Sequence, residues 1–195
     1  ATASASYAKS FQNFDYQARM WRAGCDYCAS SLVVRGVPEP LTSGNYWNSS
    51  YVFQYTRNGT YSIWKTANGV YTPLQYWASS GAIQTGDAWN TLRVVAKDAS
   101  LKFYINGALV WSGSDSSFAV GRVGLSLFRF TDDADLLKVD WARLSPPAAG
   151  ADAALEEQVS VEQQALNEAA NAQMYAPESI YMDPTGLSSS SESGQ

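Results

Sequence analysis

The chain has 195 residues, enough for one domain with an appendage, and its residues are 46% hydrophobic, 13% aromatic and only 16% charged. It contains no histidine, which excludes Ser-His-Asp and Cys-His catalysis and histidine metal sites. Residues 1–150 carry a net charge of +3 (13 Lys and Arg against ten Asp and Glu), which argues against a nucleic-acid-binding domain. No run of about 18 apolar residues predicts a membrane span.

Residues 7–145 have the pattern of short strands separated by turns. In chain order, strands are predicted at 14–24, 29–36, 49–56, 60–65, 70–79, 88–98, 101–105, 108–113, 121–130 and 136–145. Asn58-Gly59 and Asn106-Gly107 are typical of hairpin turns, because Asn and Gly tolerate a positive φ. In the second hairpin, a two-residue turn pairs Phe103 with Val110 and Lys102 with Trp111, so the Phe103 face is predicted to be core. No segment before Pro146 has the periodicity of a helix.

The composition changes after Pro146-Pro147. Residues 151–195 contain six Glu, two Asp and no Lys or Arg, a net charge of −8. We therefore divide the chain into a β domain (1–146) and an acidic extension (147–195), predicted to be part helix and part extended. Its apolar side chains argue against an inert spacer and are predicted to dock onto a protein partner or a neighbouring subunit: Met174, Tyr175, Ile180, Tyr181 and Met182.

The strand sequences resemble those of a known fold family. The segments AWNTLRVVAKDASLKFYINGALVWSG, GRVGLSLF and LKVDWARLS are similar to concanavalin A-like lectin and glucanase domains. More narrowly, FDYQARMWR, YVFQYTRNGTYSIWK and VDWARL resemble secreted bacterial domains of the 3-keto-disaccharide hydrolase and glucanase-like group. The resemblance implies an all-β antiparallel sandwich, the concanavalin A-like jelly roll, and a secreted protein. Domains of this group usually have further strands upstream, and without them the edge at 136–145 would be open.

The acidic residues do not match the catalytic pair of the laminarinase-type relatives, which carry Glu and Asp on one strand. Glu39 is the only glutamate in residues 1–150 and lies between two prolines. The cluster Asp132, Asp133 and Asp135 has three interpretations: a solvated loop, a calcium site or a catalytic site. Calcium is the only cofactor that the sequence suggests.

Cys25 and Cys28 are the only cysteines, so a zinc site lacks its further ligands. A disulfide between them is favoured over a redox motif, since no helix is predicted after them. A disulfide also fits a protein exported from the cytoplasm.

Aromatic and polar side chains on the strands suggest carbohydrate binding, because Tyr and Trp rings stack on sugars while polar groups bind hydroxyls. Strand alternation does not allow all the candidates to share one face. They are Tyr55, Arg57, Trp64, Gln75 and Trp77. We weigh three functions: a secreted, non-catalytic carbohydrate-binding or recognition module; a structural subunit of an extracellular assembly; and a glycan-processing hydrolase that uses Asp.

Overall fold

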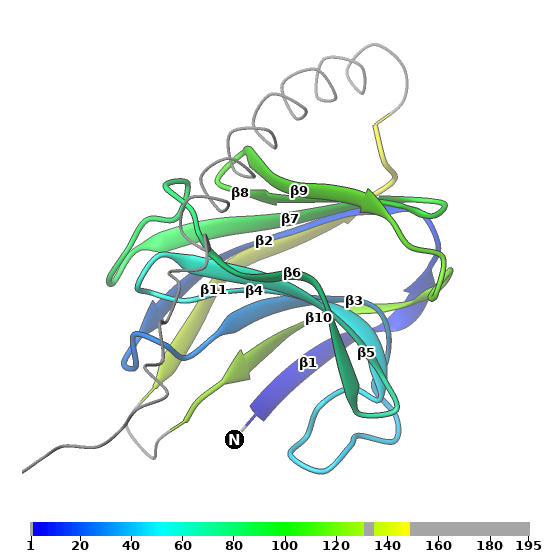
Figure 1. The fold of residues 1–195 in the computed structure, drawn as a ribbon, viewed down its shortest axis with the longest axis horizontal. Helices are drawn as coiled ribbons and strands as arrows, with labels where there is room; N and C mark the ends of the chain where they lie inside the picture. Colours follow the sequence, from blue (N-terminus) through cyan, green and yellow to red (C-terminus); the bar gives the residue numbers. More distant parts are fainter. Residues whose placement is uncertain (1, 131–134, 149–195) are drawn as a thin grey trace, which may run out of the picture.

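The computed structural model describes residues 2–130 and 135–148, which form two antiparallel sheets packed face to face (Figure 1). The first sheet has six strands, in the order β1 (Thr2–Phe11), β10 (Gly121–Phe128), β3 (Ser30–Val37), β4 (Ser49–Tyr55), β5 (Thr60–Ala67) and β6 (Val70–Ser79). The second has five strands, in the order β11 (Leu136–Ser145), β2 (Phe14–Ala23), β7 (Trp89–Lys97), β8 (Ser100–Ile105) and β9 (Ala108–Ser114). The predicted β-sandwich is confirmed.

Alternate residues of each strand point into the space between the sheets and form the core. On β4 these are Tyr51, Phe53 and Tyr55, all at most 1% exposed, and on β8 they include Phe103. Phe103 lies 5.1 Å from Phe53 between ring centroids, so aromatic contacts join the two layers. The described residues contain no helix that could cross a membrane.

The second hairpin differs from its predicted register. Ile105 pairs with Ala108 as expected, but a bulge follows and Phe103 pairs with Trp111 instead of Val110. Trp111 therefore packs against the core and does not lie opposite Lys102, as a regular hairpin would require. The extra residue of a bulge shifts every later pair by one position.

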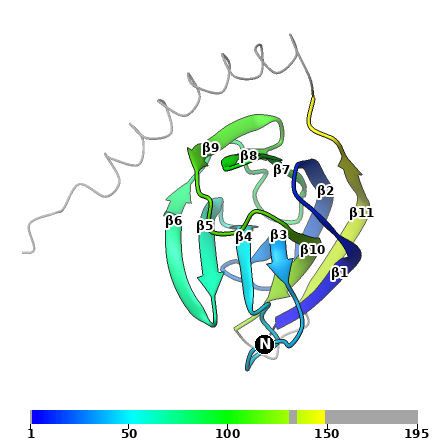
Figure 2. The ribbon, with the colours of Figure 1, turned by 90° about the vertical axis from the view of Figure 1, so that its right-hand side faces the viewer.

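Strand β1 is an edge strand that the sequence pattern does not predict. Its sequence, TASASYAKSF, pairs with β10 and is exposed along almost its whole length. Small exposed residues give no apolar alternation, so the sequence pattern predicts no strand here. At the edge of the other sheet, β11 pairs only with β2, and Figure 2 shows β1 and β11 on the same side of the sandwich.

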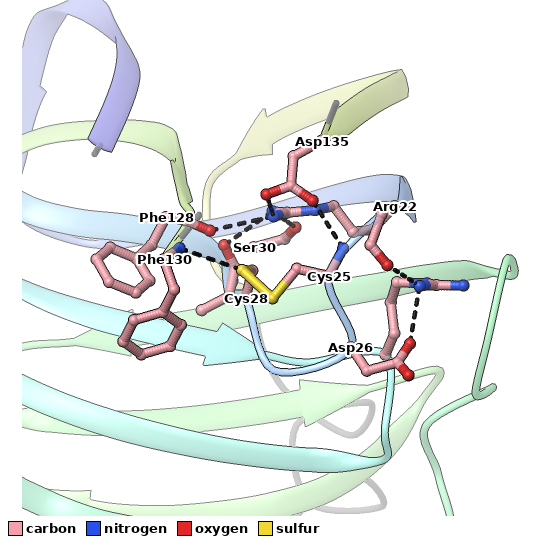
Figure 3. Close-up of a disulfide and its surroundings, with 11 residues drawn as sticks. Arg22, Cys25, Asp26, Cys28, Ser30, Phe128, Phe130 and Asp135 are labelled. Carbon is pink, nitrogen blue, oxygen red and sulfur yellow. Dashed lines mark hydrogen bonds and ion pairs between the residues drawn. A yellow bond between two sulfur atoms is a disulfide. The ribbon is translucent and has the colours of Figure 1, made fainter. Parts of the chain in front are cut away.

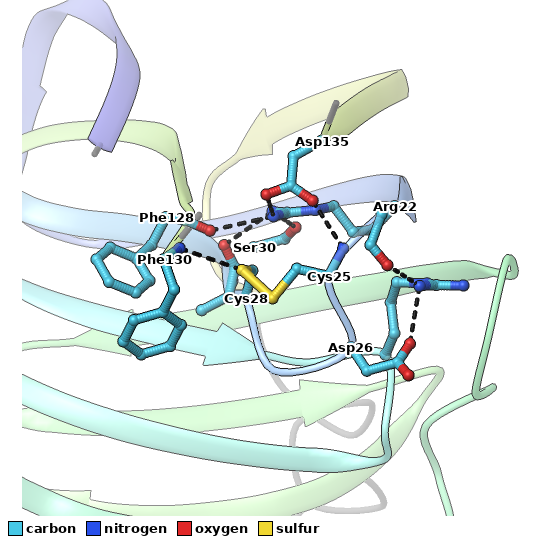
Figure 4. A network of polar contacts seen from close by, with 11 residues as sticks. Arg22, Cys25, Asp26, Cys28, Ser30, Phe128, Phe130 and Asp135 are labelled. Carbon is cyan, nitrogen blue, oxygen red and sulfur yellow. Dashed lines mark hydrogen bonds and ion pairs between the residues drawn. A yellow bond between two sulfur atoms is a disulfide. The ribbon is translucent and has the colours of Figure 1, made fainter. Parts of the chain in front are cut away.

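A disulfide and a buried ion pair close one end of the sandwich. Cys25 and Cys28 are bonded, as predicted (Figure 3). Beside them Arg22, 1% exposed, lies 3.1 Å from the Asp135 carboxylate and donates to the carbonyls of Ala29 and Phe128 (Figure 4). Asp135 also accepts a hydrogen bond from the Cys25 amide at 2.8 Å. Asp135 thereby fixes the disulfide loop to the start of β11.

A second buried arginine closes the opposite end. Arg35 is 1% exposed and has φ 48° within the β3 bulge. Its guanidinium donates to the carbonyls of Gln12, Asp98 and Phe118, at 2.8, 2.6 and 3.1 Å. These carbonyls belong to three different connections between strands, so one side chain ties the three turns together.

Asp115 stabilises the same end in a pH-dependent manner. Burial alone would raise the pKa of its carboxyl, but hydrogen bonds from Lys65, Ser117 and Tyr51 outweigh this and hold the pKa well below its usual range. A carboxyl with a lowered pKa in the folded state stabilises the fold fully above its unfolded pKa of about 3.9 and loses this contribution as the pH falls further.

We therefore expect Asp115→Asn to flatten the loss of stability below about pH 4, since the variant has no carboxylate to protonate. Urea unfolding at a series of pH values measures this. The control is Asp98→Asn, which removes an exposed carboxylate and should keep the original pH dependence. If the two variants had the same profile, Asp115 would not carry the effect.

Candidate functional site

The outer face of the six-stranded sheet carries a groove of about 370 Å³, within the range of small-molecule sites. Strand alternation builds it, because the residues between the core positions of β3, β4 and β5 point outward. We call it the sheet groove. It is lined by Thr2, Tyr27, Ala29, Ser31, Val33, Asn45, Tyr46, Trp47, Ser50, Val52, Gln54, Trp64, Thr66, Tyr71, Trp77, Ser126, Phe128 and Phe130.

Aromatic rings gather on both sides of the sheet groove. On the β5–β6 side, Trp64 lies 6.5 Å from Tyr71 between centroids, and Trp77 follows on the same strand as Tyr71. Tyr46, from the β3–β4 connection, is 5.9 Å from Tyr71 and 6.5 Å from Phe128. These rings supply the flat apolar surfaces that stack on the C–H faces of a sugar.

Hydrogen-bonding groups lie between the rings. The Trp64 indole donates to Ser62 Oγ at 2.8 Å, and Gln54 Nε2 donates to the same oxygen at 2.9 Å. Ser50 and Thr66 share a hydrogen bond of 3.2 Å across neighbouring strands. This network fixes the Trp64 and Gln54 side chains in the positions from which they line the groove.

Trp47 lies over two glycines of the sheet. A Cβ at Gly36 or Gly124 would collide with its indole ring, so these glycines make room for it. Trp47 is 4% exposed, and its indole N–H has no acceptor within residues 2–130 and 135–148. An unsatisfied buried donor is costly to the fold.

None of the described lining residues of the sheet groove is Asp, Glu, Lys or Arg. Partial burial, together with the neighbouring Tyr46, raises the pKa of Tyr71 to about 12, so that hydroxyl stays protonated at ordinary pH. The described lining thus offers stacking and hydrogen bonding, and no pair of carboxylates for general acid–base chemistry.

The structure brings together two of the five predicted sugar-binding residues, Trp64 and Trp77. Tyr55 was wrongly placed, because it points into the core with 1% exposure. Arg57 lies outside the groove and pairs with Asp26 and Asp87 in the loops at the end of the sandwich.

Gln75 is also outside the groove. It lies opposite Ile63, whose side chain is in the core, next to a bulge in β6. Its side-chain amide donates to the adjacent Tyr76 carbonyl at 3.0 Å. The bulge breaks the alternation by which Gln75 and Trp77 would otherwise share a face.

The predicted calcium site is only partly described. Asp132 and Asp133 lie outside the described residues, and Asp135 is engaged with Arg22 and the Cys25 amide. Within residues 2–130 and 135–148, no three His, Cys, Asp or Glu side chains form a group that could hold a metal ion. The predicted docking residues Met174, Tyr175, Ile180, Tyr181 and Met182 are outside the described part as well.

Six aromatic residues of the groove were not predicted from the sequence: Tyr27, Tyr46, Trp47, Tyr71, Phe128 and Phe130. Trp47 and Tyr46 lie in a connection between strands, where alternation has no meaning. The available signal was the pair of adjacent aromatic residues that follows Gly44-Asn45 in this connection, since binding residues often lie on such loops.

The fold is shared with proteins of known structure, all of low sequence identity. A carbohydrate-binding module, CBM66 from Bacillus subtilis, superposes with a TM-score of 0.59 at 18% identity, over 73% of this chain and 81% of its own. The β-glucanase of Bacillus licheniformis superposes with a TM-score of 0.56 at 16% identity, over 72% of this chain and 69% of its own. Sheep galectin-11 superposes with a TM-score of 0.50 at 10% identity, over 74% of this chain and 96% of its own. These similarities confirm the concanavalin A-like jelly roll.

A comparison with curated proteins finds no matching sequence. A family comparison does find a match: residues 2–127 match the 3-keto-alpha-glucoside-1,2-lyase-like domain. The match covers β1 to β9 and all but the last residue of β10, hence nearly the whole six-stranded sheet, and of the groove lining only Phe128 and Phe130 lie beyond it. This chain belongs to the family of 3-keto-alpha-glucoside-1,2-lyase-like domains.

Proposed function

We propose that the domain binds a neutral carbohydrate in the sheet groove. The observation that carries this proposal is the lining itself, in which Trp64, Trp77 and Tyr71 lie beside hydrogen-bonding side chains such as Gln54. Stacking on apolar sugar faces, combined with a few placed polar groups, is the usual chemistry of such sites.

The lack of charged side chains in the described lining favours neutral sugars over anionic ones. A uronic acid or a sulfated sugar would bring an anion into a groove whose described lining offers no cation. A neutral sugar has no such desolvation cost. The family and the fold shared with CBM66 are consistent with a sugar ligand. We place the protein outside the reducing cytoplasm, and the disulfide supports this location.

We expect Trp64→Ala and Trp77→Ala each to weaken binding of neutral polysaccharides by about 10-fold to 100-fold, the effect of losing one buried ring of about 1.5–3 kcal/mol. Affinity electrophoresis of the full chain through gels containing neutral glucans, galactans or fructans measures this, with polygalacturonate as the charged comparison.

The matched control is Trp89→Ala, on the five-stranded sheet, which should migrate like the unchanged protein. Trp64→Phe should retain most of the affinity if stacking is what matters. If the whole panel of neutral polysaccharides left migration unchanged, the proposal would fail.

Glycan processing is the second candidate, and one observation favours it. Phe130 lines the sheet groove and is followed at two and three residues by Asp132 and Asp133. The family description also names a lyase activity. The test is whether the protein converts a sugar that binds in the groove. If Asp132→Asn or Asp133→Asn abolished this conversion without loss of affinity, the function would be established.

A further inference from the structure

The outer face of the five-stranded sheet carries many cationic side chains, whereas the described lining of the sheet groove carries no charged side chain. The register places the odd-numbered side chains of β2 and β7 outward, together with Lys102 of β8 and alternate residues of β11. We call this surface the basic face. Its cations are Arg19, Arg93, Lys97, Lys102, Lys138 and Arg143.

Four of these cations lie over aromatic rings of the same five-stranded sheet. Each such contact contributes about 0.5–1 kcal/mol at an exposed site. The pairs, with the distance from cation to ring centroid, are Lys138 and Trp21 (4.5 Å), Arg19 and Trp89 (4.8 Å), Arg93 and Tyr104 (5.0 Å), and Arg143 and Trp141 (5.6 Å). The rings keep the cations spread over the sheet.

Few carboxylates balance this charge. Asp15 pairs with Arg93 and Asp140 pairs with Arg19, both at 2.6 Å. The other cations of the basic face, Lys97, Lys102, Lys138 and Arg143, form no ion pair with a carboxylate of residues 2–130 and 135–148. The face therefore has a net positive charge that an anionic segment could neutralise.

Such an anionic chain is covalently attached to this sheet. Residues 151–195 carry a net charge of −8, and they follow β11, the edge strand of the sheet that bears the basic face. The eleven residues from Pro146 to Glu156 span at most about 36 Å, at about 3.3 Å each. Five strands about 4.8 Å apart are about 20 Å wide, so the first glutamates can reach every strand.

We propose that the acidic segment 151–195 binds to the basic face of its own chain. Tethering favours this occupant over a second molecule, because a short linker gives an effective concentration in the millimolar range. The inference is independent of sugar binding, since the sheet groove lies on the other sheet. Failure of either proposal leaves the other unaffected.

Zero-length cross-linking of the full chain with a carbodiimide tests this, because the reagent joins only carboxylates and amines that already touch. After digestion with chymotrypsin, we expect monomeric protein to contain cross-links from Glu156, Glu157 or Glu162 to Lys102 or Lys138. They should disappear in 0.5 M NaCl, where charges are screened within a few ångströms. Lys65, on β5 of the other sheet, is the internal control and should form no cross-link to Glu156, Glu157 or Glu162.

The double variant Lys102→Glu, Lys138→Glu should abolish the cross-links, whereas Lys65→Gln should leave them unchanged. Cross-links that join these glutamates mainly to Lys65, or none at low salt, would overturn the proposal. Cross-links confined to dimers would also overturn it and show that the occupant is the acidic segment of a second copy.

Discussion

Asp135→Ala is expected to lower the free energy of unfolding by about 3–5 kcal/mol, because it leaves a buried guanidinium without its counter-charge. Both side chains of this ion pair are at most 1% exposed, so water cannot replace the lost partner. Burial lowers the pKa of Arg22 although Asp135 opposes the shift, which shows how unfavourable the isolated charge would be. The substitution also removes the acceptor of the Cys25 amide.

Urea unfolding followed by tryptophan fluorescence measures this loss. The matched control is Asp140→Ala, whose ion pair with Arg19 has side chains 40% and 45% exposed and should contribute less than about 1 kcal/mol. Adding Arg22→Met to Asp135→Ala should recover part of the stability by removing the buried charge. Equal losses in the Asp135 and Asp140 variants would contradict the account.

Phe103→Ala is expected to cost about 3–5 kcal/mol, the usual range for a buried aromatic residue. Phe103 is fully buried and lies 5.1 Å from Phe53 and 5.5 Å from Trp111, so its removal opens a cavity between the sheets. Thermal and urea unfolding measure the loss, and Phe103→Leu should lose much less because it refills most of the volume.

The same variant separates folding from the proposed function. Phe103 belongs to the five-stranded sheet and packs against Phe53 on the inner face of the six-stranded sheet, so it does not line the sheet groove. At a temperature where the variant remains folded, its affinity for a neutral polysaccharide should therefore equal that of the unchanged protein. A loss of affinity as large as that of Trp77→Ala would mean that the groove depends on the far layer.

Alternation identified the core face of the second hairpin but not that of β4. On β4 it places Tyr51, Phe53 and Tyr55 on one face, which is the core, and Tyr55 was still chosen as a sugar contact. The pairing of several strands decides which face is buried, and that pairing is not a local property. Trp64 and Trp77 were predictable as surface candidates because they alternate with core residues.

The buried arginines could not be predicted in the same way. Arg22 continues the inward series of Phe14, Tyr16, Ala18 and Met20 on β2, so its position is regular. A charge at such a position is tolerated only with a partner, and that partner is Asp135, far along the chain. A bulge displaced Trp111 and another displaced Gln75, and no short sequence signal marks either bulge.

The most direct test of sugar binding in the sheet groove uses the tryptophans as reporters. The chain has seven, and their indole N–H groups give separate resonances in a nitrogen-15 correlation spectrum. Titration of the full chain with a neutral oligosaccharide is predicted to shift the signals of Trp47, Trp64 and Trp77, while those of the basic face, Trp21, Trp89 and Trp141, stay in place. Shifts confined to the basic-face tryptophans, or none with any neutral sugar, would contradict the account.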